Sequence, residues 1–303
     1  LEQQGYYAIT DLTTPIIDCI ADYILVSGKK QFTKSELIDL PVWNRLRVNA
    51  NVVIQQLIYE NIMHSFPYEE KEILYFSYDQ MNDCFCAKTI FRKYKKEEDI
   101  RQYLIDEVLG IKNGNVTKHQ NIGLFIACCA FFAEQYKSEC IDIINMLNDD
   151  ITKRDIFSNY VSSFQWRGEI CISPEELFNE CRRYTMPVNI VWEMFITNSV
   201  RCNSQYNAEG LYKILMSLPL NKRDRLWSIY VNRLTGRDEN RLIQIIKMYD
   251  SGKKIEFSSK KERALLLELL CWCLASSDRW MRDVTSKAMV EILKDDFSLC
   301  KPL

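Results

Sequence analysis

The chain has 303 residues, of which 47% are hydrophobic and 12% aromatic, so it can fill a sizeable core and is not a disordered tail. Its 39 Lys and Arg residues nearly balance its 41 Asp and Glu residues, and the net charge of -2 provides no overall field that would attract nucleic acid or an anionic membrane. With only 9 Gly and 7 Pro residues, an all-β sandwich or barrel is disfavoured, because such folds need many tight turns.

The cysteines and the hydropathy pattern bear on the compartment. Twelve cysteines lie mostly in apolar helical patterns, such as Cys128 and Cys129, which is typical of reduced thiols in a cytosolic protein. No signal peptide is present, and the longest apolar run, residues 122–133, is shorter than the roughly 20 residues of a membrane span. We therefore expect a cytoplasmic protein without a membrane partner. Because the chain opens on Leu1 without Met and stops in mid-pattern at Leu303, we also expect a piece of a longer polypeptide.

The first 78 residues predict three helices followed by two strands. Thr14 before Pro15 has the pattern of a helix N-cap followed by a first-turn proline. A polar turn over residues 67–71 separates the two strands. The predicted elements are helices over residues 11–26, 34–40 and 42–60, and strands over residues 61–66 and 73–78.

This order is that of a winged helix-turn-helix domain, which we predict for residues 1–94. A DNA-reading third helix needs several basic and amide side chains directed at a groove. The predicted third helix has Arg45 and Arg47 among Asn and Gln residues, and the wing tip adds the acids Glu69 and Glu70. That mixed face is weak for phosphate binding. We interpret the domain as an internal regulatory winged helix and do not expect nucleic acid as a partner.

The remainder of the chain, residues 95–303, repeats a helix-turn-helix pattern after a charged connector at Tyr94. Ser173 followed by Pro174 is a clear helix start, with a cap and a first-turn proline. A typical apolar stripe at helical spacing consists of Leu242, Ile245, Ile246 and Tyr249. No strict consensus repeats, so we predict a degenerate HEAT-like or armadillo-like array. The expected fold class is mainly α, a winged helix followed by a helical-repeat region.

Catalytic and cofactor motifs are missing from the sequence. No glycine falls in a Gly-x-x-x-x-Gly-Lys-Ser/Thr loop, so we expect no nucleotide cofactor held within these residues. The two histidines, His64 and His119, are not in a metal-ligand spacing, and the pair Cys84 and Cys86 is one residue apart where zinc sites use two. We therefore predict no metal site and no enzymatic activity for this segment.

One stretch, residues 76–90, passes from a strand directly into a helix. It resembles the end of the winged-helix domain in STAND-type P-loop NTPases, the NACHT and NB-ARC relatives that include bacterial antiviral ATPases. Their signature has the form Phe-x-His/Tyr-x-x-x-x-Glu/Asp-x-x-x-Ala, and the matching positions here are Phe76, Tyr78, Asp83 and Ala87.

The resemblance implies a role for Tyr78. In the relatives the matching residue, often His, approaches the phosphates of bound ADP and helps to hold the inactive state. The Tyr78 hydroxyl would offer a neutral hydrogen bond in its place. The alternative is a structural aromatic that anchors the wing against the first helix, and Asp83 could similarly satisfy backbone donors near its helix start.

A second segment, residues 276–293, also resembles antiviral STAND proteins, whose helical arrays contain stretches reading roughly Ser-x-Arg-x-x-Arg-Asp-x-x-x-Lys-Ala. The matching charged face is made of Arg279, Arg282, Asp283 and Lys287, with Asp278 before it. On one helix the i, i+4 neighbours of this face can pair with each other or with the next repeat.

Taken together, the resemblance implies the regulatory and sensor portion of a STAND NTPase in bacterial antiphage defence. The parent would bind ATP or ADP with Mg through an upstream NTPase module, and the helical array would bind a protein partner such as a phage protein. Two alternatives remain open at this stage. One is a winged-helix DNA-binding transcription regulator, and the other is a helical-repeat scaffold without a switch.

Overall fold

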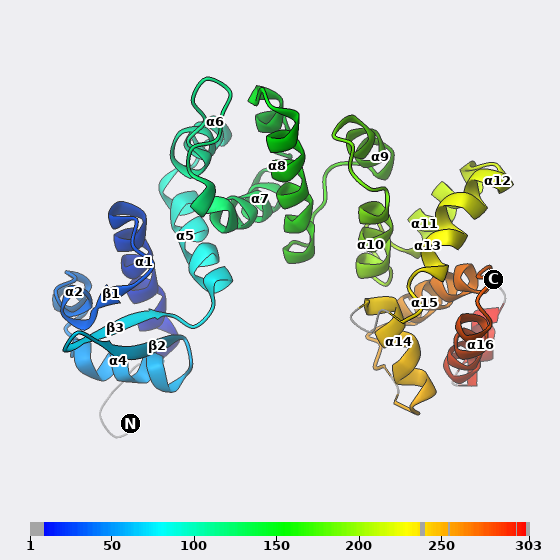
Figure 1. The fold of residues 1–303 in the computed structure, drawn as a ribbon. Helices are drawn as coiled ribbons and strands as arrows, with labels where there is room; N and C mark the ends of the chain where they lie inside the picture. Colours follow the sequence, from blue (N-terminus) through cyan, green and yellow to red (C-terminus); the bar gives the residue numbers. More distant parts are fainter. Residues whose placement is uncertain (1–8, 237–239, 254, 295, 301–303) are drawn as a thin grey trace. The chain divides into compact units, whose positions relative to one another are not determined.

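The protein is mainly helical, as predicted, with one small sheet (Figure 1). The computed structural model describes residues 9–236, 240–253, 255–294 and 296–300. Two compact units are present, Leu1–Trp166 and Arg167–Leu303. The predicted boundary at residue 94 lies inside the first unit, directly after the helix that connects the sheet to the helices following it.

The first unit begins with a helical subdomain that carries the sheet. The strands are antiparallel in the order β1-β3-β2, and α4 packs against β2 (Figure 1). Its elements are α1 (Ile9–Ser27), β1 (Phe32–Thr33), α2 (Lys34–Ile38), α3 (Val42–Leu46), α4 (Ala50–Tyr59), β2 (Met63–Tyr68) and β3 (Lys71–Phe76).

Helix α1 differs from the prediction at its start. It begins at Ile9, so Pro15 lies inside the helix and the predicted N-cap at Thr14 is wrong. A proline inside a helix removes one backbone hydrogen bond. Packing compensates for this loss, since Ile16 and Ile20 are at most 1% exposed.

The single helix predicted over residues 42–60 is also wrong, because the chain breaks between α3 and α4. Arg47 adopts the left-handed conformation with φ of 53° and ends α3. Asn49 then starts α4, and its side chain accepts hydrogen bonds from the backbone N–H groups of Asn51 and Val52. An asparagine in this position satisfies helix donors that otherwise lack partners. The break orients α4 independently of α3.

The two strands are shifted relative to the prediction and form a tight hairpin. Met63 pairs with Phe76 and Tyr68 with Lys71, so the turn consists only of Glu69 and Glu70. Both turn residues have positive φ, 45° and 64°. A two-residue hairpin turn of type I′ has positive φ at both central positions, a conformation that suits Asn and Gly and strains other residues. The sequence therefore uses a turn that its residue types disfavour.

Replacing Glu69 and Glu70 together by Asn and Gly should relieve this strain. We expect the E69N/E70G variant to raise the free energy of unfolding of the first unit by about 1 kcal/mol. Urea unfolding followed by tryptophan fluorescence measures the change. An unchanged or lowered free energy of unfolding would contradict a strained two-residue turn.

The rest of the first unit is built around α5 and α7. Helix α5 packs against α1 on one side and α7 on the other. Arg92 and Lys93, at the end of α5, form ion pairs with Asp18 and Asp22 of α1. The elements are α5 (Asp79–Lys93), α6 (Glu97–Tyr103), a π-helix (Leu104–Leu109), a 3-10 turn (His119–Asn121), α7 (Ile122–Tyr136), a 3-10 helix (Ile141–Met146), α8 (Asp150–Ser162) and a 3-10 turn (Ser163–Trp166).

The second unit is entirely helical within its described residues. The predicted start at Ser173 is confirmed, since Ser173 and Glu176 form a complete capping box. Trp192 and Trp227 meet edge to face in the core, with ring centroids 5.6 Å apart. The elements are α9 (Pro174–Arg183), α10 (Asn189–Asn198), α11 (Ala208–Ser217), α12 (Leu220–Arg223), a π-helix (Asp224–Ser228), α13 (Ile229–Asn232), α14 (Arg241–Asp250), α15 (Lys260–Cys273), α16 (Arg279–Lys294) and a 3-10 turn (Phe297–Cys300).

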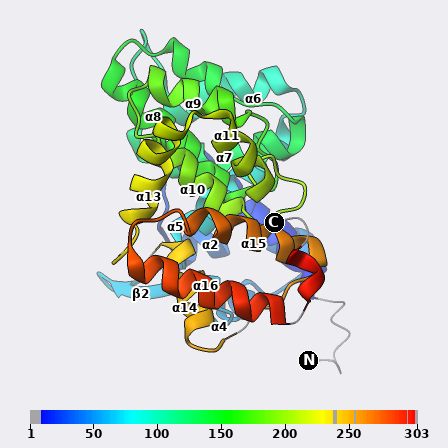
Figure 2. The ribbon, with the colours of Figure 1, turned by 90° about the vertical axis from the view of Figure 1, so that its right-hand side faces the viewer.

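Helices α14, α15 and α16 form the C-terminal part of this unit, with α16 packed against both of the others (Figure 2). Leu242, Ile246 and Tyr249 of the predicted stripe are buried, while Ile245 is half-buried. Leu267 and Leu270 of α15 are fully buried, which agrees with the apolar pattern of that helix.

Candidate functional site

The motif predicted from the sequence spans the joint between β3 and α5. Phe76, the last residue of β3, is 4% exposed and contacts Phe85 with ring centroids 5.2 Å apart. Ala87, which lies on α5 together with Phe85, is fully buried. These two positions are packing residues. They anchor the start of α5 to the sheet.

Tyr78 lies at the N-cap position of α5, but its side chain makes no capping hydrogen bond. The side chain is 68% exposed, so the predicted alternative of an aromatic that anchors the wing against the first helix is wrong. Because the side chain is exposed, Tyr78 is accessible to a bound molecule or to another protein segment.

Asp83 is the charged centre of the joint. It is only 5% exposed, and its carboxylate accepts hydrogen bonds from Lys30 Nζ at 3.1 Å and from Asn82 Nδ2 at 3.3 Å. The expected role as an acceptor of backbone donors is not what the structure shows, because both donors are side chains. Burial raises the pKa of Asp83, while the Lys30 ammonium opposes the rise.

Besides Lys30 and Asn82, the Asp83 carboxylate also contacts the start of α7. Gly123, in the first turn of α7, has no room for a side chain, since a Cβ there would lie 2.0 Å from Asp83 Oδ2. The positive end of a helix stabilises a nearby carboxylate. Asp83 therefore contacts α7 as well as the loop after α1, and we call Asp83, Lys30, Asn82 and Gly123 the Asp83 joint.

Sequence reasoning missed Lys30 and Gly123. They are 53 and 40 positions away from Asp83, and neither is part of a recognisable motif. Only the packing of α1, α5 and α7 brings them to the carboxylate.

The raised pKa of Asp83 predicts a pH dependence. A carboxyl whose folded-state pKa lies above its unfolded value favours folding at low pH, and this contribution is lost as the pH rises through the folded pKa. In the Asp83→Asn variant the side-chain amide is neutral at every pH. We therefore expect the stability of the variant relative to the wild type to increase from about pH 4 to pH 7. Thermal unfolding at several pH values measures the difference, and a difference that shrinks toward pH 7 would exclude a raised pKa.

The tight contact at Gly123 predicts a further effect. In a helix, Gly→Ala normally stabilises by about 1 kcal/mol. Gly123→Ala should instead destabilise the first unit by about 1–3 kcal/mol, because its Cβ would collide with Asp83.

Asp83→Ala vacates the space that the new Cβ needs. In a double-mutant cycle, the D83A/G123A variant should therefore lose less stability than the sum of the single variants. Urea unfolding of the four proteins measures the coupling. Additive losses would mean that the two residues do not share this space.

The charged face predicted near the C-terminus lies on α16. Arg279 Nε pairs with Asp283 at 3.5 Å, while Lys287 Nζ pairs with Asp250 of α14 at 3.0 Å. Arg282 Nη1 donates to the carbonyl oxygen of Ser276 at 2.7 Å. Among these contacts, the Lys287 pair joins α16 to α14. All of its charged groups are partly exposed, so each pair contributes little to stability.

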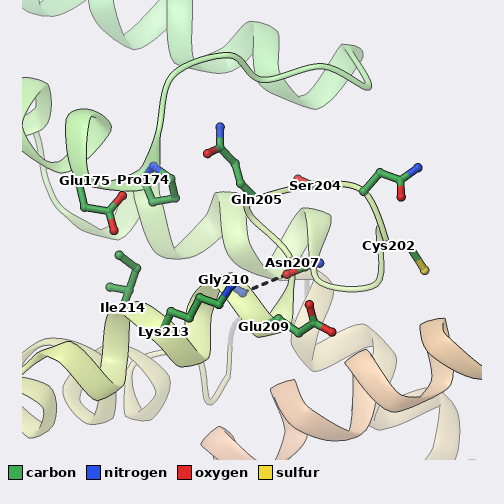
Figure 3. Close-up of a pocket in the computed structure, with 11 residues that line it drawn as sticks. Pro174, Glu175, Cys202, Ser204, Gln205, Asn207, Glu209, Gly210, Lys213 and Ile214 are labelled. Atoms are coloured by element: carbon green, nitrogen blue, oxygen red, sulfur yellow. Dashed lines mark hydrogen bonds between the residues drawn. The ribbon is translucent and has the colours of Figure 1, made fainter.

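A polar cleft of about 430 Å³ lies in the second unit, beside the starts of α9 and α11 (Figure 3). Its floor is ordered by side chains: Gln205 Nε2 donates to two backbone carbonyls at 2.9 Å, and Asn207 caps α11 by accepting from Gly210 N–H at 3.0 Å. The lining residues are Pro174, Glu175, Cys202, Asn203, Ser204, Gln205, Asn207, Glu209, Gly210, Lys213 and Ile214.

The cleft offers hydrogen-bonding groups of both kinds together with two carboxylates and one ammonium group. Its lining includes Cys202 but no histidine. Such a lining suits binding of a polar surface.

The two histidines lie apart from these sites. His64 is exposed on β2 and contacts the ring of Tyr75, with centroids 5.9 Å apart. His119 lines a shallow cleft of about 340 Å³ that also includes Thr152 and Asp155. Across the described ranges, no group of three or more His, Cys, Asp or Glu side chains could hold a metal ion. No helix of the part that the structure describes is long and apolar enough to cross a membrane.

Comparison with known proteins adds no relative: no family model, no curated protein and no solved structure matches this chain.

Proposed function

We propose that the chain is the regulatory and sensor portion of a STAND NTPase in bacterial antiphage defence. Residues 1–94 would act as a winged-helix switch that responds to ATP or ADP with Mg bound by an NTPase module of the parent protein. The helices of residues 95–303 would bind a protein partner such as a phage protein. No step of catalysis is assigned to the segment itself.

The observation that carries the proposal is the order of elements before α5. Helix, strand, three further helices and an antiparallel hairpin follow one another, and the first strand pairs with the hairpin in one sheet. A helical segment followed by an antiparallel hairpin supports the proposal of a winged helix. The chain then enters α5 through Phe76 and Tyr78, the positions that carry the resemblance.

The same region argues against the alternative of DNA recognition. Helix α4, which would be the recognition helix of a winged helix, spans Ala50–Tyr59 and contains no Lys or Arg. Proteins that read DNA depend on basic side chains for contacts to phosphates. An uncharged α4 fits an internal regulatory role better.

The Asp83 joint supports the idea of a switch. A buried carboxylate with one cationic partner stabilises an arrangement only while that partner is in place. Lys30 comes from the loop after α1, and its side chain is 42% exposed, so it can leave without unfolding the core. Separation of Lys30 from Asp83 would remove one of the contacts that hold α1 against α5, and a change in such contacts is what a rotation of this domain would use.

In the second unit, we propose that the polar cleft beside the starts of α9 and α11 is where the protein partner binds. Glu175, Glu209 and Lys213 are exposed around it and can recognise charged groups of a protein surface. Helical arrays commonly bind partners through extended surfaces of this kind.

The test uses the native polypeptide that contains this chain. We expect a Walker-type loop in it and expect titration calorimetry to detect ADP binding in the presence of Mg. Tyr78→Phe removes one neutral hydrogen bond and should weaken ADP binding by about three- to tenfold.

Tyr68→Phe is the matched control, since Tyr68 is also an exposed tyrosine of the same subdomain, at 59%. It should bind ADP as the wild type does. Absence of nucleotide binding in the native polypeptide would refute the STAND proposal. Nucleotide binding that is equal in both variants would remove the role of Tyr78 alone.

A further inference from the structure

Two cysteine thiols touch in the core of the first unit. Cys140 Sγ donates a hydrogen bond to Cys129 Sγ at 3.3 Å, and both residues are 1% exposed. Cys129 lies on α7, and Cys140 directly precedes the 3-10 helix Ile141–Met146. A disulfide has an S–S length of about 2.05 Å, so small side-chain rotations would bring the two sulfur atoms into bonding distance.

The chain reversal between the two cysteines is held by Arg101. Its Nη2 donates to the carbonyl oxygen of Glu139 at 2.8 Å and to Ser138 Oγ at 3.2 Å. The same guanidinium lies over the ring of Phe132, 4.6 Å from its centroid. Arg101 thus ties the residues just before Cys140 to the helix that carries Cys129. These contacts hold the segment before Cys140 against α7, so the two thiols are kept close to each other.

We propose that Cys129 and Cys140 form a site of oxidative modification, at which a small peroxide converts the two thiols into a disulfide. This inference is independent of the proposed function. Burial restricts the site to an oxidant as small as hydrogen peroxide, because larger disulfides cannot reach the sulfur atoms.

The reaction balances with one peroxide. One sulfur attacks a peroxide oxygen, the O–O bond breaks, and a sulfenic acid and one water form. The second sulfur then attacks the sulfenic sulfur, the S–S bond forms, the S–O bond breaks, and a second water leaves with the remaining thiol proton. Two cysteines are oxidised and the peroxide is reduced to two waters. Since the second sulfur is already in contact, the sulfenic acid should not accumulate.

Cys128 provides a matched control within the same helix. It is also fully buried, and burial raises the pKa of its thiol well above the usual value. The side chains of Cys128 and Cys129 point in different directions from α7, because consecutive helical residues are rotated by about 100°. The sulfur–sulfur contact described above is made by Cys129, so the disulfide should form there.

The experiment is peptide mapping of the whole chain after treatment with hydrogen peroxide. Trypsin cuts after Lys137, so the disulfide would join two peptides, residues 119–137 and 138–153. After remaining thiols are alkylated, mass spectrometry should detect the joined pair, about 2 Da lighter than the sum of the reduced peptides. Dithiothreitol should separate them.

Variants decide which sulfur reacts. The joined pair should persist in Cys128→Ala and be lost in both Cys129→Ala and Cys140→Ala. The inference is overturned if the pair persists in Cys129→Ala, or if both thiols of the wild type remain alkylatable after peroxide treatment. Accumulation of sulfinic acid at either position without the joined pair would overturn it as well. Fragmentation of the wild-type pair locates the linked sulfur independently of the variants.

Discussion

The carboxylate of Asp83 is the contact on which the arrangement of the first unit depends. A buried charge is tolerated only with a partner, and here the partner is supplied by Lys30, from a loop distant in sequence. Gly123 closes the remaining side, so α7 can approach α5 only because it has no side chain at that point. One carboxylate thereby links three segments: α5, the loop after α1 and the start of α7.

Two further ion pairs connect α1 to the other end of α5, through Asp18 with Arg92 and Asp22 with Lys93. The Asp18 pair resembles the Lys30–Asp83 pair in exposure, because a nearly buried carboxylate meets a basic side chain that is almost half exposed. In the Asp22 pair both side chains are partly exposed, so solvent screens it more. Aliphatic packing provides most of the stability along α1 and α5. Asp83 and Asp18 are the two buried carboxylates of this interface, and loss of the cationic partner at either one would leave a buried charge without its ion pair.

In the second unit, a hydrogen-bond network of partly buried polar groups joins neighbouring helices. Glu193 accepts hydrogen bonds from the Tyr230 hydroxyl at 2.7 Å and from Asn240 at 3.1 Å, and burial beside this carboxylate raises the pKa of Tyr230. Such a network fixes the mutual position of α10, α13 and α14. The polar cleft lies at helix starts whose caps are complete, so its exposed charges are available for binding while its framework is rigid.

The sequence by itself determined the features that depend on neighbours along the chain. The mainly helical class, the cap at Ser173 and the apolar stripe of α14 follow from local periodicity and capping chemistry. Local patterns did not reveal the break at Arg47 or the tight turn at Glu69, because both adopt positive φ against the preference of their residue types. The partners of Asp83 and the contact between Cys129 and Cys140 were decided by tertiary structure alone. Both depend on which helix faces pack together, and that choice minimises exposed apolar area over the whole unit and is not encoded in any short stretch.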